Sequence, residues 1–196
     1  FDCENMVWSK SVYFLVGNNE HGTDPKCVFE GVAINNYHSQ DRAMVLLENN
    51  TELKAQAGLD VVTDPGCAVV YEDGVYKVVP AVASITANEV TRYYATLQAA
   101  VNAAQANETV TLLSDAAGAG VVIDKNVIID FNDKTYTVNQ AVGSAGTETL
   151  GFQILKDNTV TLKNGTLKST TPVVTGKEVK MLIQNYANLT LTDMNL

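Results

Sequence analysis

Acidic side chains are the residues of this chain best suited to catalysis or metal binding. From residue 115 onward they are Asp115, Asp124, Asp130, Asp133, Glu148, Asp157, Glu178 and Asp193. Acid–base catalysis and calcium binding both need several charged groups that converge on one point. This stretch has no adjacent pair of aspartates, and no arginine follows Arg92. We therefore expect no catalytic residue, no metal site and no cofactor.

The remaining polar candidates are also predicted to have structural roles. Asp130 and Asp133 could share one turn, but Asp133 stands where Asp and Asn are common because their side chains bond to nearby backbone. His21 and His38 lie in loop-like surroundings without a neighbouring nucleophile motif. The GAG triplet at 118–120 lacks the spacing of a phosphate loop, so we interpret it as a turn.

The three cysteines, Cys3, Cys27 and Cys67, are far apart and form no CxxC pair. A zinc site therefore has little support. Free or buried thiols remain one interpretation, and one disulfide with a leftover thiol remains the other.

Composition limits the classes of partner. Hydrophobic residues make up 46% of the 196 residues, which is enough to form a substantial core. The chain has 13 basic and 22 acidic residues, a net charge of −9. Nucleic-acid binding needs concentrated Lys and Arg, so we expect no nucleic-acid partner. No apolar run approaches the roughly 20 residues of a transmembrane helix, so we expect no transmembrane segment.

The two ends of the sequence suggest a piece of a longer protein. The chain begins FDCENMVWSK, with neither an initiator Met nor a signal-peptide pattern. Its last residues, TLTDMNL, still alternate as a strand does. We expect the C-terminal part to be truncated.

Short alternating runs rich in Val, Ile, Leu, Thr and Tyr fill the chain from about residue 108. They occur at 108–115, 120–131, 134–138, 150–155, 158–170, 178–185 and 187–196. Asn, Asp and Gly separate them, as is typical of short strands joined by turns. An all-β fold is predicted.

These runs repeat. Val160 and Leu162 match Leu189 and Leu191 at an offset of 29 residues, and the IIDF run at 128–131 matches at an offset of 31. A fixed period of this length is the signature of stacked repeats. Equivalent strands should pair in parallel, with these apolar residues stacked in one core.

A short amphipathic helix is predicted at about 96–106, before the first repeat. Leu97, Ala100, Val101 and Ala104 recur with helical spacing, and Thr96 stands as the N-cap. Such a helix can lie across the open end of a coil and protect its strand edges.

The N-terminal part is predicted to be a separate β-rich unit covering residues 1–80. Residues 66–79 read as a hairpin around Glu72, Asp73 and Gly74, preceded by strand-like runs. We interpret this unit as the last turns and closing hairpin of a preceding module. PAVAS at 80–84 would be the linker to a second unit at 81–196.

Four motifs carry a family resemblance: YATLQAAVNAA, TVTLLSD, NVIIDFNDKTY and NTVTLKNGT. With them the chain resembles right-handed parallel β-helix proteins of the pectate-lyase-like superfamily, in particular the non-catalytic tandem units of large surface or secreted bacterial proteins. The resemblance covers roughly residues 70–196 and implies a β-helix with an N-terminal capping helix. Asp133 departs from the pattern, where a glycine is usual.

Two irregular insertions, at 139–149 and 171–178, fall at the same place in successive repeats. Loops at equivalent positions lie on one side of a coil, and such insertions often form the binding face. The candidate binding residues are Gln140, Ser144, Thr147, Glu148, Thr175, Lys177 and Glu178.

The leading functional expectation is a non-catalytic extracellular or cell-surface module. It would bind a glycan or a host or cell-surface protein, or act as a rigid spacer. A fragment of a polysaccharide lyase or hydrolase is one alternative. A phage fibre or capsid-decorating protein is the other.

Overall fold

The computed structural model describes residues 12–16, 26–28, 43–48, 51–55, 57–171 and 175–196. In this part of the chain the structure consists of strands and one short helix, so the predicted all-β class is confirmed. The chain divides into two compact units, Phe1–Pro80 and Ala81–Leu196. None of the described helices is long and apolar enough to cross a membrane.

The first unit contains two small sheets. One is parallel, in the order β1-β3-β5, and the other has the order β2-β4-β7-β6. The strands are β1 (Val12–Val16), β2 (Lys26–Val28), β3 (Ala43–Leu47), β4 (Glu52–Lys54), β5 (Asp60–Thr63), β6 (Cys67–Glu72) and β7 (Val75–Pro80). The predicted hairpin is confirmed as β6 and β7, and Asp73 and Gly74 both have positive φ at its tip. Strand β7 pairs antiparallel with β4 and so covers its edge.

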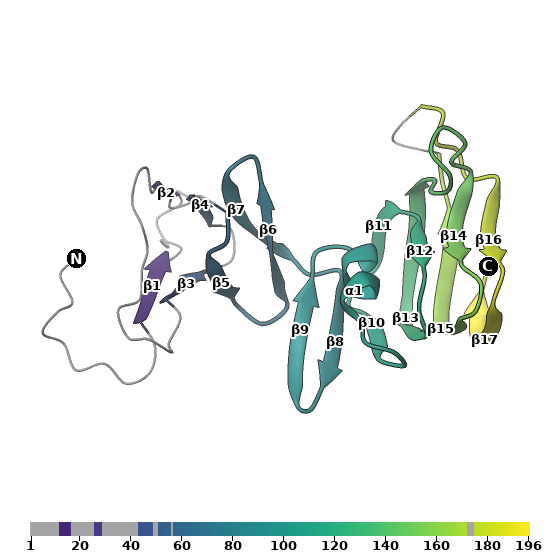
Figure 1. Cartoon of the computed structure of the whole chain (residues 1–196), viewed down its shortest axis with the longest axis horizontal. Coiled ribbons are helices and arrows are strands. Elements are labelled where there is room, and N and C mark those ends of the chain that lie inside the picture. The colour runs from purple at the N-terminus through teal and green to yellow at the C-terminus, as the bar shows by residue number, and fades with distance from the viewer. Residues whose placement is uncertain (1–11, 17–25, 29–42, 49–50, 56, 172–174) are drawn as a thin grey trace, which may run out of the picture. The chain divides into compact units, whose positions relative to one another are not determined.

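The second unit contains a larger sheet in the order β17-β15-β13-β10-β8-β9, with β11 beside β13, and a three-stranded sheet β12-β14-β16 (Figure 1). The strands are β8 (Ala83–Ala87), β9 (Val90–Tyr94), β10 (Thr109–Leu112), β11 (Ala116–Ala119), β12 (Val121–Ile123), β13 (Val127–Gln140), β14 (Leu150–Ile154), β15 (Thr159–Ser169), β16 (Met181–Asn185) and β17 (Asn188–Asn195).

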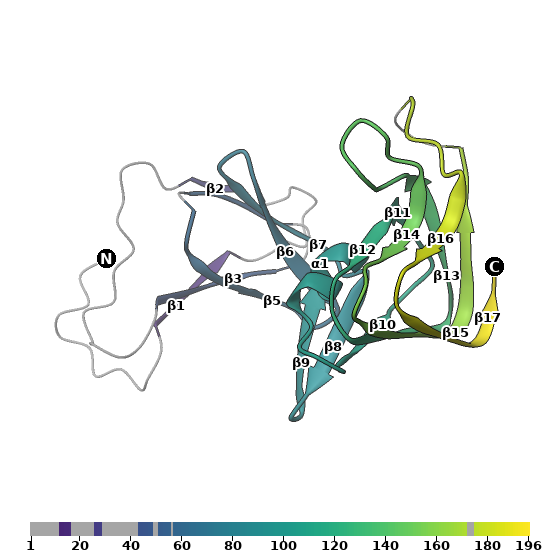
Figure 2. The ribbon, with the colours of Figure 1, turned by 45° about the vertical axis from the view of Figure 1, so that its right-hand side comes forward.

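Equivalent strands of successive repeats pair in parallel and in register. Ile129 of β13 pairs with Leu162 of β15, which pairs with Leu191 of β17. Ile129 and Leu162 are fully buried in a common interior, around which the strands are arranged in Figure 2. The predicted offset of 29 between β15 and β17 is confirmed. The predicted offset of 31 is wrong before the corner of β13, where Ile129 and Leu162 are 33 residues apart, but it holds after the corner, where Tyr136 pairs with Leu167.

The wrong offset has a local cause at the corner inside β13. The register with β15 shifts between Asp130 and Lys134, so the corner of β13 is longer than that of β15. Asn132 and Asp133 both have positive φ there, while β15 has one such residue, Asn164. Asn and Asp tolerate this left-handed backbone better than most residues, so Asp133 can replace the usual glycine.

Helix α1 (Leu97–Ala103) covers the first repeat as predicted. The Thr96 hydroxyl accepts a hydrogen bond from Ala99 N at 3.1 Å, which confirms the N-cap. Leu97, Ala100 and Val101 are fully buried against the strand interior. The C-cap is Ala104, so the helix is shorter than the predicted 96–106.

The predicted linker at 80–84 is partly wrong, because Ala83 and Ser84 belong to β8. This strand forms an antiparallel hairpin with β9 and pairs antiparallel with β10. Ala83 and Ile85 are fully buried in the core of the second unit, which explains why the segment is held as a strand. Because of β8 and β9 the larger sheet is mixed and not purely parallel.

Candidate binding surface

The two predicted insertions lie side by side in the structure. One joins β13 to β14, the other joins β15 to β16, and both project from the same side of the second unit (Figures 1 and 2). Backbone hydrogen bonds join them, from Ala141 N to Lys177 O at 2.9 Å and from Lys180 N to Thr149 O at 2.8 Å. We call the described residues 141–149 and 175–180 the crest.

An ion pair also joins the two loops. Nζ of Lys177 lies 2.6 Å from Oε1 of Glu148, and both side chains are largely shielded from solvent, with 28% and 21% of their surface exposed. The hydrogen bond from Lys177 is the main cause that lowers the pKa of the Glu148 carboxyl below its usual value. The structure therefore brings these two candidates together but binds them to each other.

Ser144 and Thr147 form the tip of the first loop. Thr147 donates to Ser144 O from its backbone N at 2.9 Å and from its hydroxyl at 3.3 Å. Gly146 has a φ of 81°, which a type II turn requires at its third position. Both hydroxyl-bearing residues are exposed, so this turn presents polar groups to solvent.

The other three candidates have different positions. Gln140 ends β13 at the base of the crest, where its carbonyl accepts from Gly120 N at 2.8 Å. Thr175 is exposed in the second loop. Glu178 is exposed and accepts a hydrogen bond from Gly176 N at 3.3 Å, so it stabilises its own loop. Of these three residues, only Thr175 therefore adds an exposed hydroxyl group to those of Ser144 and Thr147.

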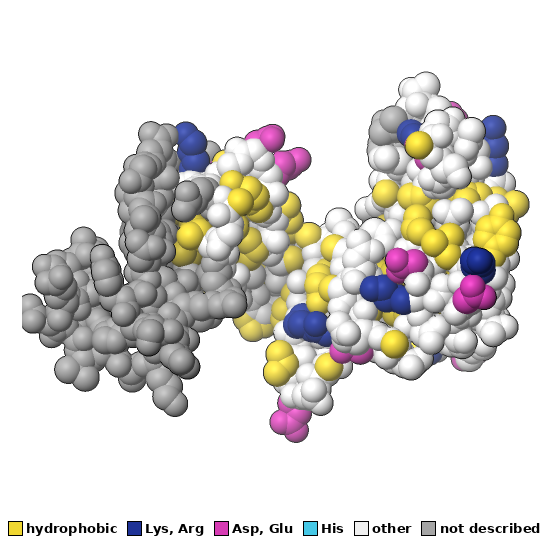
Figure 3. All heavy atoms as spheres, in the orientation of Figure 1, with side chains coloured by type: hydrophobic (Ala, Val, Ile, Leu, Met, Phe, Trp, Pro, Cys, Tyr) yellow, Lys and Arg dark blue, Asp and Glu magenta, His cyan; other side chains and the backbone are white. Residues whose placement is uncertain are grey.

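The crest presents polar groups to solvent. Its exposed side chains include three that carry a hydroxyl, on Ser144, Thr147 and Thr175, and two that are charged, on Glu178 and Lys180. Glu148 and Lys177 are paired with each other, and the described residues of the crest include no aromatic ring. In Figure 3 the projecting loops present mainly polar and backbone atoms, whereas hydrophobic side chains gather below them. Such a surface suits a hydroxyl-rich ligand that binds without deep burial.

The carboxylate of Asp130 forms structural contacts at the corner of β13. Oδ1 of Asp130 accepts from Asn132 N at 2.9 Å and from Nδ2 of Asn164 at 3.1 Å, and Oδ2 lies 3.2 Å from Nζ of Lys163. Burial raises the pKa of Asp130. The hydrogen bonds and the charge of Lys163 together lower this pKa by more than burial raises it, so the net shift is downward. Asp133 and Asp193 have the positive φ expected of turn residues. The described residues contain no group of three or more His, Cys, Asp or Glu side chains that could hold a metal.

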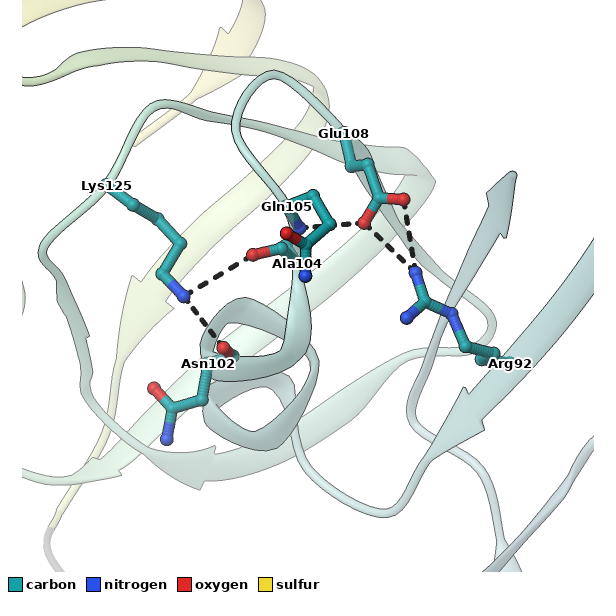
Figure 4. Close-up of polar contacts among 6 residues, drawn as sticks. All are labelled: Arg92, Asn102, Ala104, Gln105, Glu108 and Lys125. Atoms are coloured by element: carbon teal, nitrogen blue, oxygen red, sulfur yellow. Dashed lines mark hydrogen bonds and ion pairs between the residues drawn. The ribbon is translucent and has the colours of Figure 1, made fainter. Parts of the chain in front are cut away.

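A polar cluster at the C-terminal end of α1 was not predicted (Figure 4). Nζ of Lys125 donates to the carbonyls of Asn102 at 2.7 Å and Ala104 at 3.4 Å, which the end of the helix leaves unsatisfied. Both carboxylate oxygens of Glu108 accept from Nη2 of Arg92, at 3.0 and 3.1 Å. The cluster therefore fixes the helix against its neighbouring strands.

A shallow, open depression on the face of β11, β13 and β15 was also missed. Its lining residues are Asp115, Ala116, Ala117, Thr135, Thr137 and Lys168. The prediction of a turn at 118–120 is wrong, because Gly118 and Ala119 belong to β11. The run AAGA has neither β-branched nor aromatic residues, so its sequence carries no strand signal.

Cys67 is a half-buried free thiol. Burial, and then the nearby Asp64, raise the pKa of its thiol above the usual value. Cys3, His21 and His38 lie outside the described residues, and the side chain of Cys27 is also outside them. The alternatives for those cysteines stay as predictions.

Comparison of the chain with protein-family models, with curated proteins and with solved structures gives no significant match.

Proposed function

We propose that this chain is a non-catalytic glycan-binding module of a bacterial surface or secreted protein, located outside the cell. Its second unit would be a right-handed parallel β-helix, a reading supported by the in-register parallel pairs β13–β15–β17 and β12–β14–β16. The antiparallel hairpin and α1 would then be its N-terminal cap.

One observation carries the binding role. Loops from two successive repeats are joined by backbone hydrogen bonds and by the pair Glu148–Lys177 into one polar crest. A preorganised surface loses less conformational entropy on binding than two independent loops would lose. Exposed hydroxyls at Ser144, Thr147 and Thr175 can exchange hydrogen bonds with sugar hydroxyls.

We expect single-site binding to be weak, with dissociation constants of about 0.1 to 1 mM, because few contacts are desolvated. The chain should therefore be displayed on beads at high density against a panel of neutral glycans, since multivalency raises the apparent affinity. Hits should then be titrated in solution while the amide spectrum is recorded. Chemical-shift changes should concentrate at 141–149 and 175–180.

A pair of double variants makes the test specific. Ser144→Ala with Thr147→Ala should abolish retention of the beads. Thr86→Ala with Thr91→Ala removes a hydroxyl pair 2.9 Å apart on the β8–β9 hairpin and should leave retention unchanged. Equal retention of the two double variants would show that the crest is not the glycan-binding surface. New reducing or unsaturated ends after incubation with polysaccharides would contradict a non-catalytic role.

A further inference from the structure

The shallow depression on β11, β13 and β15 lies on strands that lead into the crest. Its lining includes Thr137 of β13 and Lys168 of β15, which pair in register near the carboxyl ends of their strands. The distance along the chain from Thr137 to Ala141, where the crest begins, is about 13 Å at roughly 3.3 Å per residue. None of the lining residues belongs to β17, the last strand of this sheet.

The depression forms because the outward side chains of β11 are small. Ala117, which pairs with Thr137, is exposed, and so is Ala119. Gly118 is small for a packing reason, since a Cβ there would lie 2.6 Å from Oη of Tyr136. An exposed strand position favours a β-branched residue over alanine. Ala117 therefore keeps a recess open at some cost in strand propensity.

Hydrogen-bond donors and acceptors surround this recess. Asp115 is exposed, and its Oδ1 accepts from Thr135 N at 2.8 Å, so the carboxylate keeps lone pairs for a ligand. Lys168 is exposed across β13 from it and can donate. The hydroxyls of Thr135 and Thr137 can both donate and accept. Sugar hydroxyls, which also donate and accept, match such a lining.

The charge and size of the depression favour part of a neutral chain. Its lining holds one carboxylate and one ammonium group, whereas the whole chain has a net charge of −9, which disfavours an acidic polysaccharide. Its volume is about 300 Å³, at the lower end of the range for small-molecule sites. The depression therefore has room for a short part of a glycan.

We propose that the depression is a second subsite for the glycan that binds the crest, and that the ligand is a neutral, linear oligosaccharide lying along β13. This inference rests on the proposed function of the crest. Val138 is fully buried, so its neighbours Thr137 and Asn139 face outward between the two subsites. A chain that reaches both subsites gains from each, because its second contact is intramolecular.

Chain length tests this inference. Oligosaccharides of the neutral series that the beads retain best, from disaccharide to hexasaccharide, should be titrated against the full chain while the amide spectrum is recorded. The disaccharide should shift resonances of the crest. The hexasaccharide should also shift those of residues 115–117, 135–137 and 168, and it should bind at least about tenfold more tightly.

The outcomes separate the two proposals. Equal affinities for both lengths, with shifts confined to the crest, would overturn the second subsite and leave binding at the crest intact. Absence of shifts at the crest with every length would overturn both.

A matched pair of alanine variants fills or spares the recess. Ala117→Ile fills it with a residue that suits a strand, so the affinity for the hexasaccharide should fall to that for the disaccharide. Ala99→Leu, at an exposed alanine of α1, suits its helix and should leave the tenfold gain unchanged. A gain that survives Ala117→Ile would overturn the inference.

A third variant tests the hydroxyl contact without filling the recess. Thr137→Val keeps the branched shape of the side chain but removes its hydroxyl. It should weaken hexasaccharide binding about fivefold and leave disaccharide binding unchanged. Equal weakening for both lengths would show that the variant acts on the crest, and would count against a separate subsite.

Discussion

The side-chain amide of Gln98 pairs with the backbone of Val122 as a neighbouring strand would. Val122 N donates to Oε1 of Gln98 at 2.7 Å, and Nε2 of Gln98 donates to Val122 O at 3.0 Å. One side chain of α1 thus satisfies the exposed edge of β12. A helix covers a sheet edge effectively only when the backbone groups of that edge find partners.

The first prediction follows from this pair. Gln98→Ala should lower the free energy of unfolding by about 1 to 3 kcal/mol, because it leaves the part-buried N–H and C=O of Val122 unpaired. Gln98→Glu keeps an acceptor for Val122 N but cannot donate when ionised, so its stability should recover at acidic pH. Urea unfolding measures both effects. Gln105→Ala, at an exposed glutamine just after the helix, is the control and should change stability by less than about 0.5 kcal/mol.

The second prediction concerns the pair Glu148–Lys177. The pKa of Glu148 is lower in the folded protein than its usual value, so this group stabilises the fold above the unfolded pKa. That contribution is lost as pH falls through the folded pKa, below the usual value of 4.5. Lys177→Met should therefore destabilise the crest at pH 7, and this effect should fade as acid protonates Glu148.

Amide exchange of residues 141–149 against pH measures this effect. Lys156→Met is the control, because Lys156 contacts Asp157 at 3.9 Å with both side chains over 80% exposed. An effect of Lys177→Met that persisted at low pH would show that the lysine acts through packing rather than charge.

The third prediction concerns the corner at Asp130. Asn164→Asp would replace the hydrogen bond from Nδ2 with a second carboxylate about 3.1 Å from Oδ1 of Asp130. We expect a loss of about 1 to 3 kcal/mol at pH 7. The loss should shrink when acid protonates one carboxylate. Asn164→Gly keeps the left-handed backbone, whose φ is 58°, without adding charge, and thermal unfolding of the two variants separates repulsion from the lost bond. Equal, pH-independent losses would contradict the repulsion.

The fourth prediction concerns the spacing of β14 and β16. Gly151→Ala would place a methyl group 2.5 Å from Leu182 O, so the strands must move apart. We expect a destabilisation of about 1 to 3 kcal/mol. Gly146→Asn is the matched control, because nothing lies within 4 Å of a Cβ there and Asn tolerates the positive φ. Unaltered stability of Gly151→Ala would mean that these strands lie farther apart.

Most of the second unit could be predicted from the alternating runs and their recurrence. Val160 and Leu162 are inward and buried, and the N-cap at Thr96 is where the sequence placed it. Alternation and capping are local signals, and local signals are readable without the tertiary structure.

The misses have physical reasons. Strand β11 is built from Ala and Gly, and it is held by pairing with β13 rather than by its own propensity. The extra corner residues near Asp133 changed the register without disturbing the alternation on either side. The linker predicted at 80–84 overlaps only the start of β8, and no hairpin is predicted for β8 and β9, although Asn88 and Glu89, both with positive φ, form its turn.

The sequence could predict where the two loops of the crest lie, but not how their individual side chains interact. The sequence placed two insertions at equivalent positions, and the structure sets them side by side. It could not show that Glu148 and Lys177 neutralise each other, because their pairing depends on side chains 29 residues apart that meet only after the repeats stack.

Strand β17 ends the larger sheet, and among the described strands only β15 pairs with it, which gives the second unit an order of unfolding. Each repeat contacts only its neighbours, and the N-terminal end is held by α1 and by the pair Gln98–Val122. Local unfolding should therefore begin at β17 and β16 and advance toward β10. Deuterium uptake would then record the repeats in reverse order of their place in the chain.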